Sequence, residues 1–190
     1  MIILRKIAVY CGAAAGNNPT YANSARKLGK WMASNNIGLV YGGGQFGLMG
    51  FIAKTVIENG GHVDGIIPEN LAARGASYQA VSNLQVVKDM SIRKQLMMDM
   101  ADGFIALPGG PGTLEEISEV FSWSLIGDNN KPCVLFNTNH YYDNLQNMYD
   151  HMVVEGFLTS QARQKLLFSD SVEQIAEFMD TYVPPKIREY

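Results

Sequence analysis

The feature that most constrains the fold is a regular alternation of short apolar runs with longer segments of helical period. The short runs are rich in Val, Ile and Leu and end at Gly, Pro or Asp, which is typical of buried strands. In chain order they are KIAVYC, IGLVY, HVDGIIP, LQVV, GFIALP and PCVLF. Elsewhere apolar residues recur every three or four positions, which predicts helices over 19–35, 46–58, 91–100, 113–126, 141–155 and 172–182.

Strands that are apolar throughout and separated by helices favour a mostly parallel sheet, covered on both faces and wound with right-handed crossovers. We therefore expect an α/β protein with a Rossmann-like three-layer αβα domain. The chain has 190 residues, of which 47% are hydrophobic, enough for one substantial core and too few for two ordinary domains. The prediction is a single nucleotide-binding domain over 1–183, followed by a polar, proline-stiffened surface tail over 184–190.

Charge and cysteine usage narrow the setting. The net charge is −3 and the basic residues are scattered, so no nucleic acid or membrane surface is expected as a partner. No apolar run approaches the roughly 18 residues that span a bilayer, and the opening MIILRKIAVYCG lacks the pattern of a signal peptide. We expect a cytoplasmic protein that binds a small molecule. Cys11 and Cys133 lie in apolar segments without metal-ligand spacing, which predicts buried free thiols.

The first of two glycine clusters, VYGGGQFGLMG, follows the second predicted strand and opens a helix. It formally matches the dinucleotide fingerprint GxGxxG through Gly42, Gly44 and Gly47. That fingerprint belongs after the first strand, with an acidic residue at the end of the next, whereas the nearest candidate, Asp64, lies inside a strand. NAD is therefore disfavoured. A P-loop is disfavoured too, because apolar residues follow Gly47 where that motif needs Lys and Ser or Thr.

The second cluster, PGGPGT, follows the fifth predicted strand and opens another helix. Glycines let the backbone approach a ligand closely, and free amides at a helix start attract anions. Because both clusters follow strands at the carboxyl edge of the predicted sheet, together they could hold one nucleoside phosphate. Two simpler interpretations stay open. The glycines could only make tight turns, or Thr113 and Glu116 could form a capping box.

Two basic residues, Arg93 and Lys94, stand at the start of the helix that leads into the second cluster. Basic groups at a helix start oppose its dipole, so helix stability alone does not require them. They are either a solvated face or a source of positive charge for a ligand in the crevice.

The stretches YGGGQFGLMG, DMSIRK and PGGPGTLEE, in this order and spacing, resemble the LOG (Lonely guy) family of cytokinin riboside 5'-monophosphate phosphoribohydrolases, whose signature is PGGxGTxxE. CGAAAG and GIIP extend the resemblance, which runs from about residue 6 to 157. The resemblance implies a homodimer of Rossmann-like fold that hydrolyses the N-glycosidic bond of AMP or N6-prenylated AMP, releasing the base and ribose 5-phosphate. Many members of this family were first labelled lysine decarboxylases.

By motif match, the resemblance implies that Arg93 and Glu116 are the catalytic pair. The implied substrate contacts are Lys94, Gly43, Gly44, Gly109, Gly110, Gly112, Thr113 and Ser122. The residue types suit the reaction, because a carboxylate can stabilise the charge that develops on ribose and activate water, while an arginine supplies positive charge. A bound phosphate would position the glycosidic bond, so the free nucleoside should be a much poorer substrate. No step requires a metal or an organic cofactor.

Two departures from the family pattern affect base selectivity. Ser91 stands where the family usually has the histidine of DMHxRK, and Gly75 follows Arg74 where plant-like members have an acidic residue. That acidic side chain is expected near the exocyclic amine of the base, so its absence predicts a shifted preference or a looser pocket. Whether the substrate is AMP or a cytokinin nucleotide stays open.

Two other functions also stay open. A non-catalytic nucleotide or cofactor carrier of the same fold would bind tightly without turnover. A lysine decarboxylase would need pyridoxal phosphate on a lysine such as Lys94, and the sequence offers no partner for the ring nitrogen. The histidines, His62, His140 and His151, lie outside the glycine motifs and are expected to be structural or at the surface.

Overall fold

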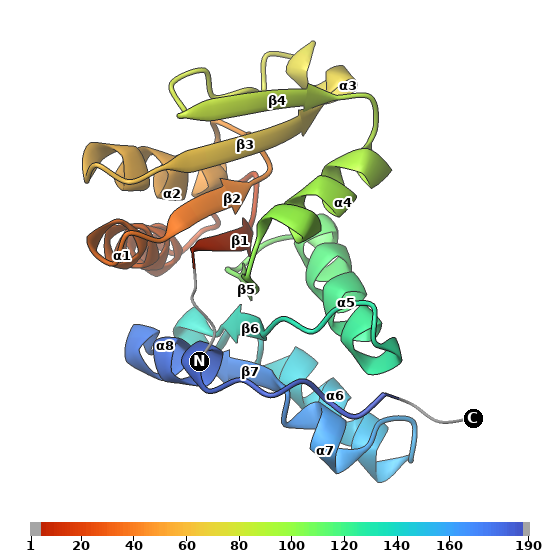
Figure 1. Ribbon diagram of the computed structural model, residues 1–190. Coiled ribbons are helices and arrows are strands. Elements are labelled where there is room, and N and C mark those ends of the chain that lie inside the picture. The colour runs from red at the N-terminus through yellow and green to blue at the C-terminus, as the bar shows by residue number, and fades with distance from the viewer. Residues whose placement is uncertain (1–4, 188–190) are drawn as a thin grey trace.

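Across residues 5–187, the part of the chain that the computed structural model describes, seven parallel strands form one sheet in the order β4-β3-β2-β1-β5-β6-β7. The strands are β1 (Lys6–Tyr10), β2 (Gly38–Tyr41), β3 (Val63–Pro68), β4 (Asn83–Val87), β5 (Gly103–Ala106), β6 (Cys133–Phe136) and β7 (Leu166–Ser169). Figure 1 shows helices on both faces of this sheet, which confirms the predicted three-layer Rossmann-like fold.

Burial explains why most strands are apolar throughout. β1 lies in the middle of the sheet, with Ile7 opposite Leu39 of β2 on one side and Gly103 of β5 on the other. Every residue of β2, β3, β5 and β6 is buried, whereas the edge strand β4 is half-buried to exposed. The other edge strand, β7, is missing from the predicted set, although three of the four residues of its run LLFS are apolar.

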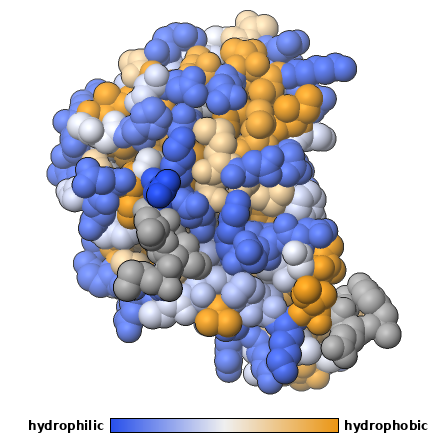
Figure 2. All heavy atoms as spheres, in the orientation of Figure 1, coloured by the Kyte–Doolittle hydropathy of each residue, from blue (hydrophilic) through white to orange (hydrophobic). Residues whose placement is uncertain are grey.

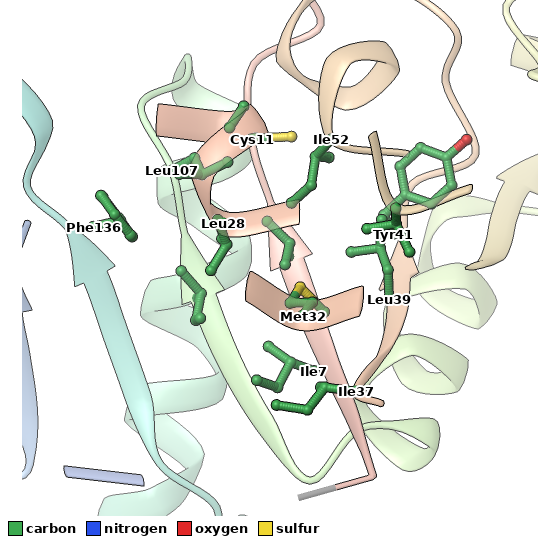
Figure 3. Packing of buried hydrophobic residues seen from close by; sticks show 14 of the residues in the cluster. Ile7, Cys11, Leu28, Met32, Ile37, Leu39, Tyr41, Ile52, Leu107 and Phe136 are labelled. Carbon is green, nitrogen blue, oxygen red and sulfur yellow. The ribbon is translucent and has the colours of Figure 1, made fainter. Parts of the chain in front are cut away.

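The helices form two layers. One face carries α1 (Pro19–Ser34), α2 (Gly47–Glu58) and α8 (Val172–Asp180), and the other carries α4 (Met90–Met100), α5 (Pro111–Ile126), α6 (Asp143–Val154) and the short α7 (Ser160–Arg163). Figure 3 shows the first layer packing on the sheet, with Leu28 and Met32 of α1 over Ile7 and Leu39. Two further short helices, α3 (Glu69–Ala72) and the 3₁₀ turn η1 (Thr138–His140), follow β3 and β6.

The starts of α5 and α4 differ from the predicted ones. α5 begins at Pro111 with Gly110 as its N-cap and no side-chain capping bond, so the capping-box interpretation of Thr113 and Glu116 is wrong. Proline is favoured at the first helical position, and it moves the start two residues upstream of the threonine. α4 begins at Met90, and Asp89 caps it by accepting a hydrogen bond from a backbone N–H, which leaves the predicted basic residues one turn inside the helix.

The strand order reverses at β1, since the chain leaves this strand toward β2 and later returns to its other side as β5. In sheets of this type the crevice for a ligand opens at the carboxyl ends of the strands beside such a reversal. Here the loops after β1 and β5 are joined by a hydrogen bond in which Gly12 N–H donates to the Pro108 carbonyl oxygen at 3.1 Å.

A polar cluster surrounds the buried carboxylate of Asp64 at the amino ends of the strands, the end opposite to the crevice. Lys6 Nζ lies 2.8 Å from Asp64 Oδ2, and His62 Nε2 and Asn83 Nδ2 each lie 3.2 Å from Oδ1 of the same carboxylate. Strand β2 lies between the strands of Lys6 and Asp64, so the Lys6 side chain passes over β2 to reach the carboxylate. It passes at Gly38, where an added Cβ would lie 3.2 Å from Lys6 Cγ. A side chain at 38 would therefore require the Lys6 side chain to shift by a few tenths of an ångström.

Apolar side chains gather on one part of the surface. Figure 2 shows orange atoms toward the upper right, over the region of β4 and α4 in Figure 1, with polar side chains interspersed around them. Val86, Met90 and Ile92 of these elements are exposed apolar residues. Residues 183–187 belong to no helix or strand, and the last residues of the predicted tail lie outside the described residues.

Candidate active site

A cavity of about 300 Å³ opens at the carboxyl ends of the strands, where the strand order reverses. It is lined by the end of β1 and its loop, by the glycine after β2, by the start of α4 and by the first turns of α5. Its lining residues include Tyr10, Cys11, Gly12, Gly42, Met49, Met90, Arg93, Gly110, Gly112, Thr113 and Glu116. The cavity thus joins both glycine clusters with the predicted catalytic pair.

The sequence-predicted pair meets inside this cavity. Arg93 Nη1 lies 2.8 Å from Glu116 Oε1, and both residues are more than nine-tenths buried. Arg93 is fixed from two other sides, because its Nε donates to the Ile66 carbonyl oxygen at 3.2 Å and its Nη1 lies 3.0 Å from Met90 Sδ. Two helices and a strand therefore position one guanidinium group against one carboxylate.

The carboxylate of Glu116 lies close to Arg93, but its hydrogen-bonding capacity is not filled. Oε1 is buried, and its contact with Arg93 is not aligned as a hydrogen bond, so within the described residues this oxygen accepts none. Burial raises the pKa of Glu116 above its ordinary value, while the charge of Arg93 opposes that rise. A buried carboxylate of this kind beside a cavity has an oxygen available for a ligand or a water molecule.

Gly42 makes room for the arginine. A Cβ at this position would lie 2.1 Å from Arg93 Nη2, closer than any real contact. Glycine is therefore required here by the close approach of the guanidinium group. The sequence pattern included Gly42 only as part of a rejected dinucleotide fingerprint.

The start of α5 provides an anion-binding edge. Gly110 is the N-cap, Gly112 and Thr113 are in the first turn, and all three line the cavity. Amides at a helix N-terminus and the helix dipole both attract negative charge. Thr113 is buried against Gly109, where a Cβ would lie 2.1 Å from Thr113 Oγ1, so glycine at 109 is needed for this side chain to pack.

Four of the predicted substrate contacts do not line this cavity. Gly43 has φ +72° and its carbonyl oxygen accepts a hydrogen bond from Tyr78 N–H, while Gly44 forms an isolated bridge with Ser77. Ser122 is exposed on α5. Lys94 binds Glu115 and Glu119 instead.

A fifth predicted contact, Gly109, lines a neighbouring apolar cavity of about 290 Å³ together with Tyr21 and Tyr141. Gly12 and Gly110 line both cavities. Gly12, Met49, Met90 and Tyr10 were not among the predicted site residues. For Gly12 the usable signal was its place directly after the first strand.

The histidines lie away from the cavity. His62 belongs to the Asp64 cluster at the opposite edge, and His140 and His151 are exposed. Among residues 5–187, no three His, Cys, Asp or Glu side chains gather as a metal site would require. In the same part of the chain, no helix combines the length and apolar character needed to cross a membrane.

Two known structures with the same fold bind the molybdenum cofactor. The molybdenum cofactor binding protein of Rippkaea orientalis is 20% identical, with a TM-score of 0.70 over 95% of this chain and 98% of that protein. The Moco carrier protein of Chlamydomonas reinhardtii is 22% identical, with a TM-score of 0.68 over 92% and 95%. At this level of identity the likeness shows the fold alone.

Sequence relatives are more similar. A family described as possible lysine decarboxylase matches residues 49–179. A cytokinin riboside 5'-monophosphate phosphoribohydrolase of Arabidopsis thaliana is 42% identical over 95% of this chain and 84% of its own length, and one of Rhodococcoides fascians is 43% identical over 89% and 86%. With this identity and coverage, the chain belongs to the LOG family of phosphoribohydrolases, as its glycine and arginine motifs indicate.

Proposed function

We propose that this protein is a nucleoside 5'-monophosphate phosphoribohydrolase that cleaves the N-glycosidic bond of AMP or of an N6-modified AMP. One observation carries the proposal: a buried, incompletely satisfied Glu116 pairs with Arg93 in the cavity that also contains the anion-binding start of α5. The phosphoribohydrolase activity for which the relatives are named requires a phosphate site and groups that act on a glycosidic bond. The cavity of this protein has candidates for both.

Binding begins with the phosphate. Gly110, Gly112 and Thr113 line the cavity at the positive end of the helix dipole, which suits a phosphate dianion. Glu116 lies one turn further along the same helix, so a ribose attached to that phosphate would come within reach of its carboxylate. The phosphate thus contributes binding energy that positions the bond to be broken.

Cleavage then needs one water molecule and two charged side chains. The water oxygen bonds to C1', the C1'–N bond breaks, and its electron pair stays on the base nitrogen. The proton that the water loses passes through Glu116 and solvent to this nitrogen, so the products are ribose 5-phosphate and the free base. Glu116, ionised, stabilises the positive charge that develops on ribose and takes a proton from the attacking water. Arg93 keeps its charge throughout and acts by orienting Glu116 and offsetting negative charge on phosphate or base.

The base preference depends on two positions outside the catalytic pair. Ser91 lies on α4 and lines a smaller cavity of about 210 Å³ between α4 and α5, and Gly75, with φ +73°, has open space where a side chain would stand. Neither residue places a charge near the base. We infer a tolerant base site that accepts both AMP and N6-substituted AMP.

A cofactor carrier of the same fold is the weaker alternative. Its support is the fold of the molybdenum cofactor binding proteins, which share about a fifth of their sequence with this chain. A carrier does not need a buried carboxylate whose pKa is raised. Burying such a charged group lowers the stability of the fold, which favours a catalytic role for it.

The decarboxylase label of the matched family fits the site poorly. Pyridoxal phosphate would need a lysine that can lose its proton to form a Schiff base. Lys94, the lysine nearest the pair in sequence, is bound by Glu115 and Glu119, and these contacts raise its pKa. Its surroundings hold the ammonium form, opposite to what that chemistry needs.

We also propose a cytoplasmic homodimer. The exposed Met90 and Ile92 of α4 and Leu114 of α5 lie next to the cavity, and covering them with a second copy would remove apolar surface from water. Buried free thiols at Cys11 and Cys133 suit a reducing compartment. Light scattering coupled to size-exclusion chromatography, at twice the 20.9 kDa chain mass, would support the dimer.

The experiment that tests the function supplies the purified protein with AMP, N6-isopentenyl-AMP and adenosine, and quantifies free base and ribose 5-phosphate by liquid chromatography. We expect base release from both monophosphates and at least about 100-fold less from adenosine, because the phosphate anchors the substrate. Tight AMP binding without base release would favour the carrier. Equal cleavage of adenosine would contradict the phosphate site.

A further inference from the structure

We propose that Lys94 is a positioning residue, which binds Glu115 and Glu119 of α5 and thereby holds Glu116 against Arg93. The proposal rests on the hydrolase function above. It gives Lys94 a role different from the substrate contact that the family resemblance implies.

The ammonium group of Lys94 is bound by two carboxylates, and Lys94 does not itself line the cavity that contains the start of α5. Its Nζ lies 3.0 Å from a carboxylate oxygen of Glu119 and also contacts the carboxylate of Glu115. Lys94 lines the cavity of about 210 Å³ between α4 and α5, and not the one of about 300 Å³ that contains the start of α5. The two cavities meet at Tyr10 and Glu116, but an ammonium group already shared by two carboxylates is less available to bind the phosphate.

The two glutamates bracket the catalytic one. Glu115 directly precedes Glu116, and Glu119 lies one turn beyond Glu115 on the same helix. One ammonium group between them ties the second and third turns of α5 to α4. An isolated surface pair contributes little, but a shared and partly buried network holds one geometry more firmly. These helices also carry the 2.8 Å contact between Arg93 and Glu116, so loosening their crossing would loosen that contact.

The charges around Glu116 give Lys94 a second effect. The groups that face Glu116 are Arg93 and Lys94 on α4, Glu115 and Glu119 on α5, and Tyr10 and Cys11 at the end of β1. Burial raises the pKa of both Tyr10 and Cys11, so these two are uncharged. Burial is also the main cause that raises the pKa of Glu116, Glu115 adds to the rise, and Arg93 and Lys94 oppose it. Removing Lys94 leaves Arg93 alone to oppose the repulsion from Glu115.

The test compares Lys94→Met, Lys94→Arg and the triple variant K94M/E115Q/E119Q in pH profiles of kcat/KM for AMP. Lys54→Met is the matched control, because it removes the lysine of an exposed pair with Glu58 on α2. We expect Lys94→Met to lose at least about tenfold in kcat/KM on the acidic side, mostly through kcat, with the acidic limb moved to higher pH. The triple variant should return the acidic limb to its wild-type position, because the repulsion is removed with the lysine, but it should keep the loss in kcat, because α4 and α5 are still not tied together.

Lys94→Arg should retain most activity, and Lys54→Met should match the wild type. Ionisation of the substrate phosphate is common to all variants, so differences between them report on the protein. A uniform rise in KM at every pH after Lys94→Met, with no recovery in the triple variant, would show that Lys94 binds substrate and would overturn the proposal. Unchanged kinetics would overturn it too.

A second readout does not depend on turnover. In protein carrying ¹³C at glutamate carboxyl carbons, the Glu116 signal is identified by its loss in Glu116→Gln and followed against pH. Its midpoint should rise in Lys94→Met and return in the triple variant; no change would refute the role of Lys94. If the wild type fails to hydrolyse AMP, the proposed function fails, and this titration still decides the question about Lys94.

Discussion

Two buried carboxylates, at opposite ends of the strands of the same sheet, differ in how completely their neighbours bind them. Asp64, near the amino ends of the strands, is surrounded by Lys6, His62 and Asn83. Burial pushes the pKa of Asp64 upward, but these hydrogen bonds outweigh it and bring the pKa below the ordinary 3.8. Glu116, at the carboxyl edge, has one poorly aligned partner, and burial raises its pKa above the ordinary 4.5.

The difference separates a carboxylate that stabilises from one that can react. A charge whose hydrogen-bonding capacity is filled by the protein strengthens the fold and offers nothing to a ligand. A charge left incompletely satisfied in a cavity costs stability but has an oxygen free for water or substrate. Asp64 and Glu116 are therefore a matched pair for experiments that separate stability from activity.

The largest effect on activity is expected from Arg93→Ala. Loss of the guanidinium group removes the charge that offsets burial of Glu116, and kcat/KM for AMP should fall by about 100- to 1,000-fold. Steady-state kinetics with AMP checks this. Arg26→Ala is the control, since Arg26 lies over the Phe51 ring on the other face of the sheet, and it should leave the kinetics unchanged.

Gly42→Ala should lower activity by about 10- to 100-fold without unfolding the protein. The added Cβ would meet the end of the Arg93 side chain, which can move, so the pair is disturbed while the backbone is kept. Gly44→Ala is the matched control, because its Cβ would meet only the flexible Met49 Sδ at 3.2 Å. Equal losses in the two variants would show that the cluster acts in another way.

Asp64→Asn should destabilise the fold by about 1 to 2 kcal/mol at neutral pH and leave kcat/KM nearly unchanged. The estimate is reduced because Lys6 is partly exposed. Since the folded pKa of Asp64 is lowered, its contribution is complete above the unfolded pKa, near 3.8, and is lost as the pH falls through the folded value. Urea unfolding of both proteins across the acidic range should show their difference shrinking. A difference that grows toward acid would contradict the assignment.

The smallest effect is expected from His62→Ala. The His62 side chain is 54% exposed and its contact with Asp64 is 3.2 Å long, so its loss should cost about 0.5 kcal/mol or less. Thermal unfolding beside Asp64→Asn would measure it. A loss as large as that of Asp64→Asn would mean that His62, and not Lys6, dominates the cluster.

Periodicity predicts most of this fold, and particular residues show where it fails. Both helix-start signals around residue 111 are genuine: proline is favoured at the first helical position and threonine at the N-cap. The structure uses the proline, and a local pattern could not choose between them. β7 was missed although its run LLFS is as apolar as the predicted LQVV, because a run of four residues is too short for periodicity to decide.

The site was predictable only in part. Arg93 and Glu116 were identified through a resemblance, because their contact depends on how α4 crosses α5. Lys94 is adjacent in sequence but faces another cavity, and which way a helical side chain points depends on the rotation of the helix in the fold. Asp64 was considered only as a dinucleotide ligand, since its partners come from three separate strands and their flanks.

The most direct test measures ribose 5-phosphate released from AMP by the wild type, Glu116→Gln and Asp64→Asn, each normalised to folded protein. The account predicts release by the wild type and Asp64→Asn and a loss of at least about 100-fold in Glu116→Gln, although AMP still binds it. If Glu116→Gln releases ribose 5-phosphate as fast as the wild type, Glu116 is not the reacting carboxylate and the account is wrong.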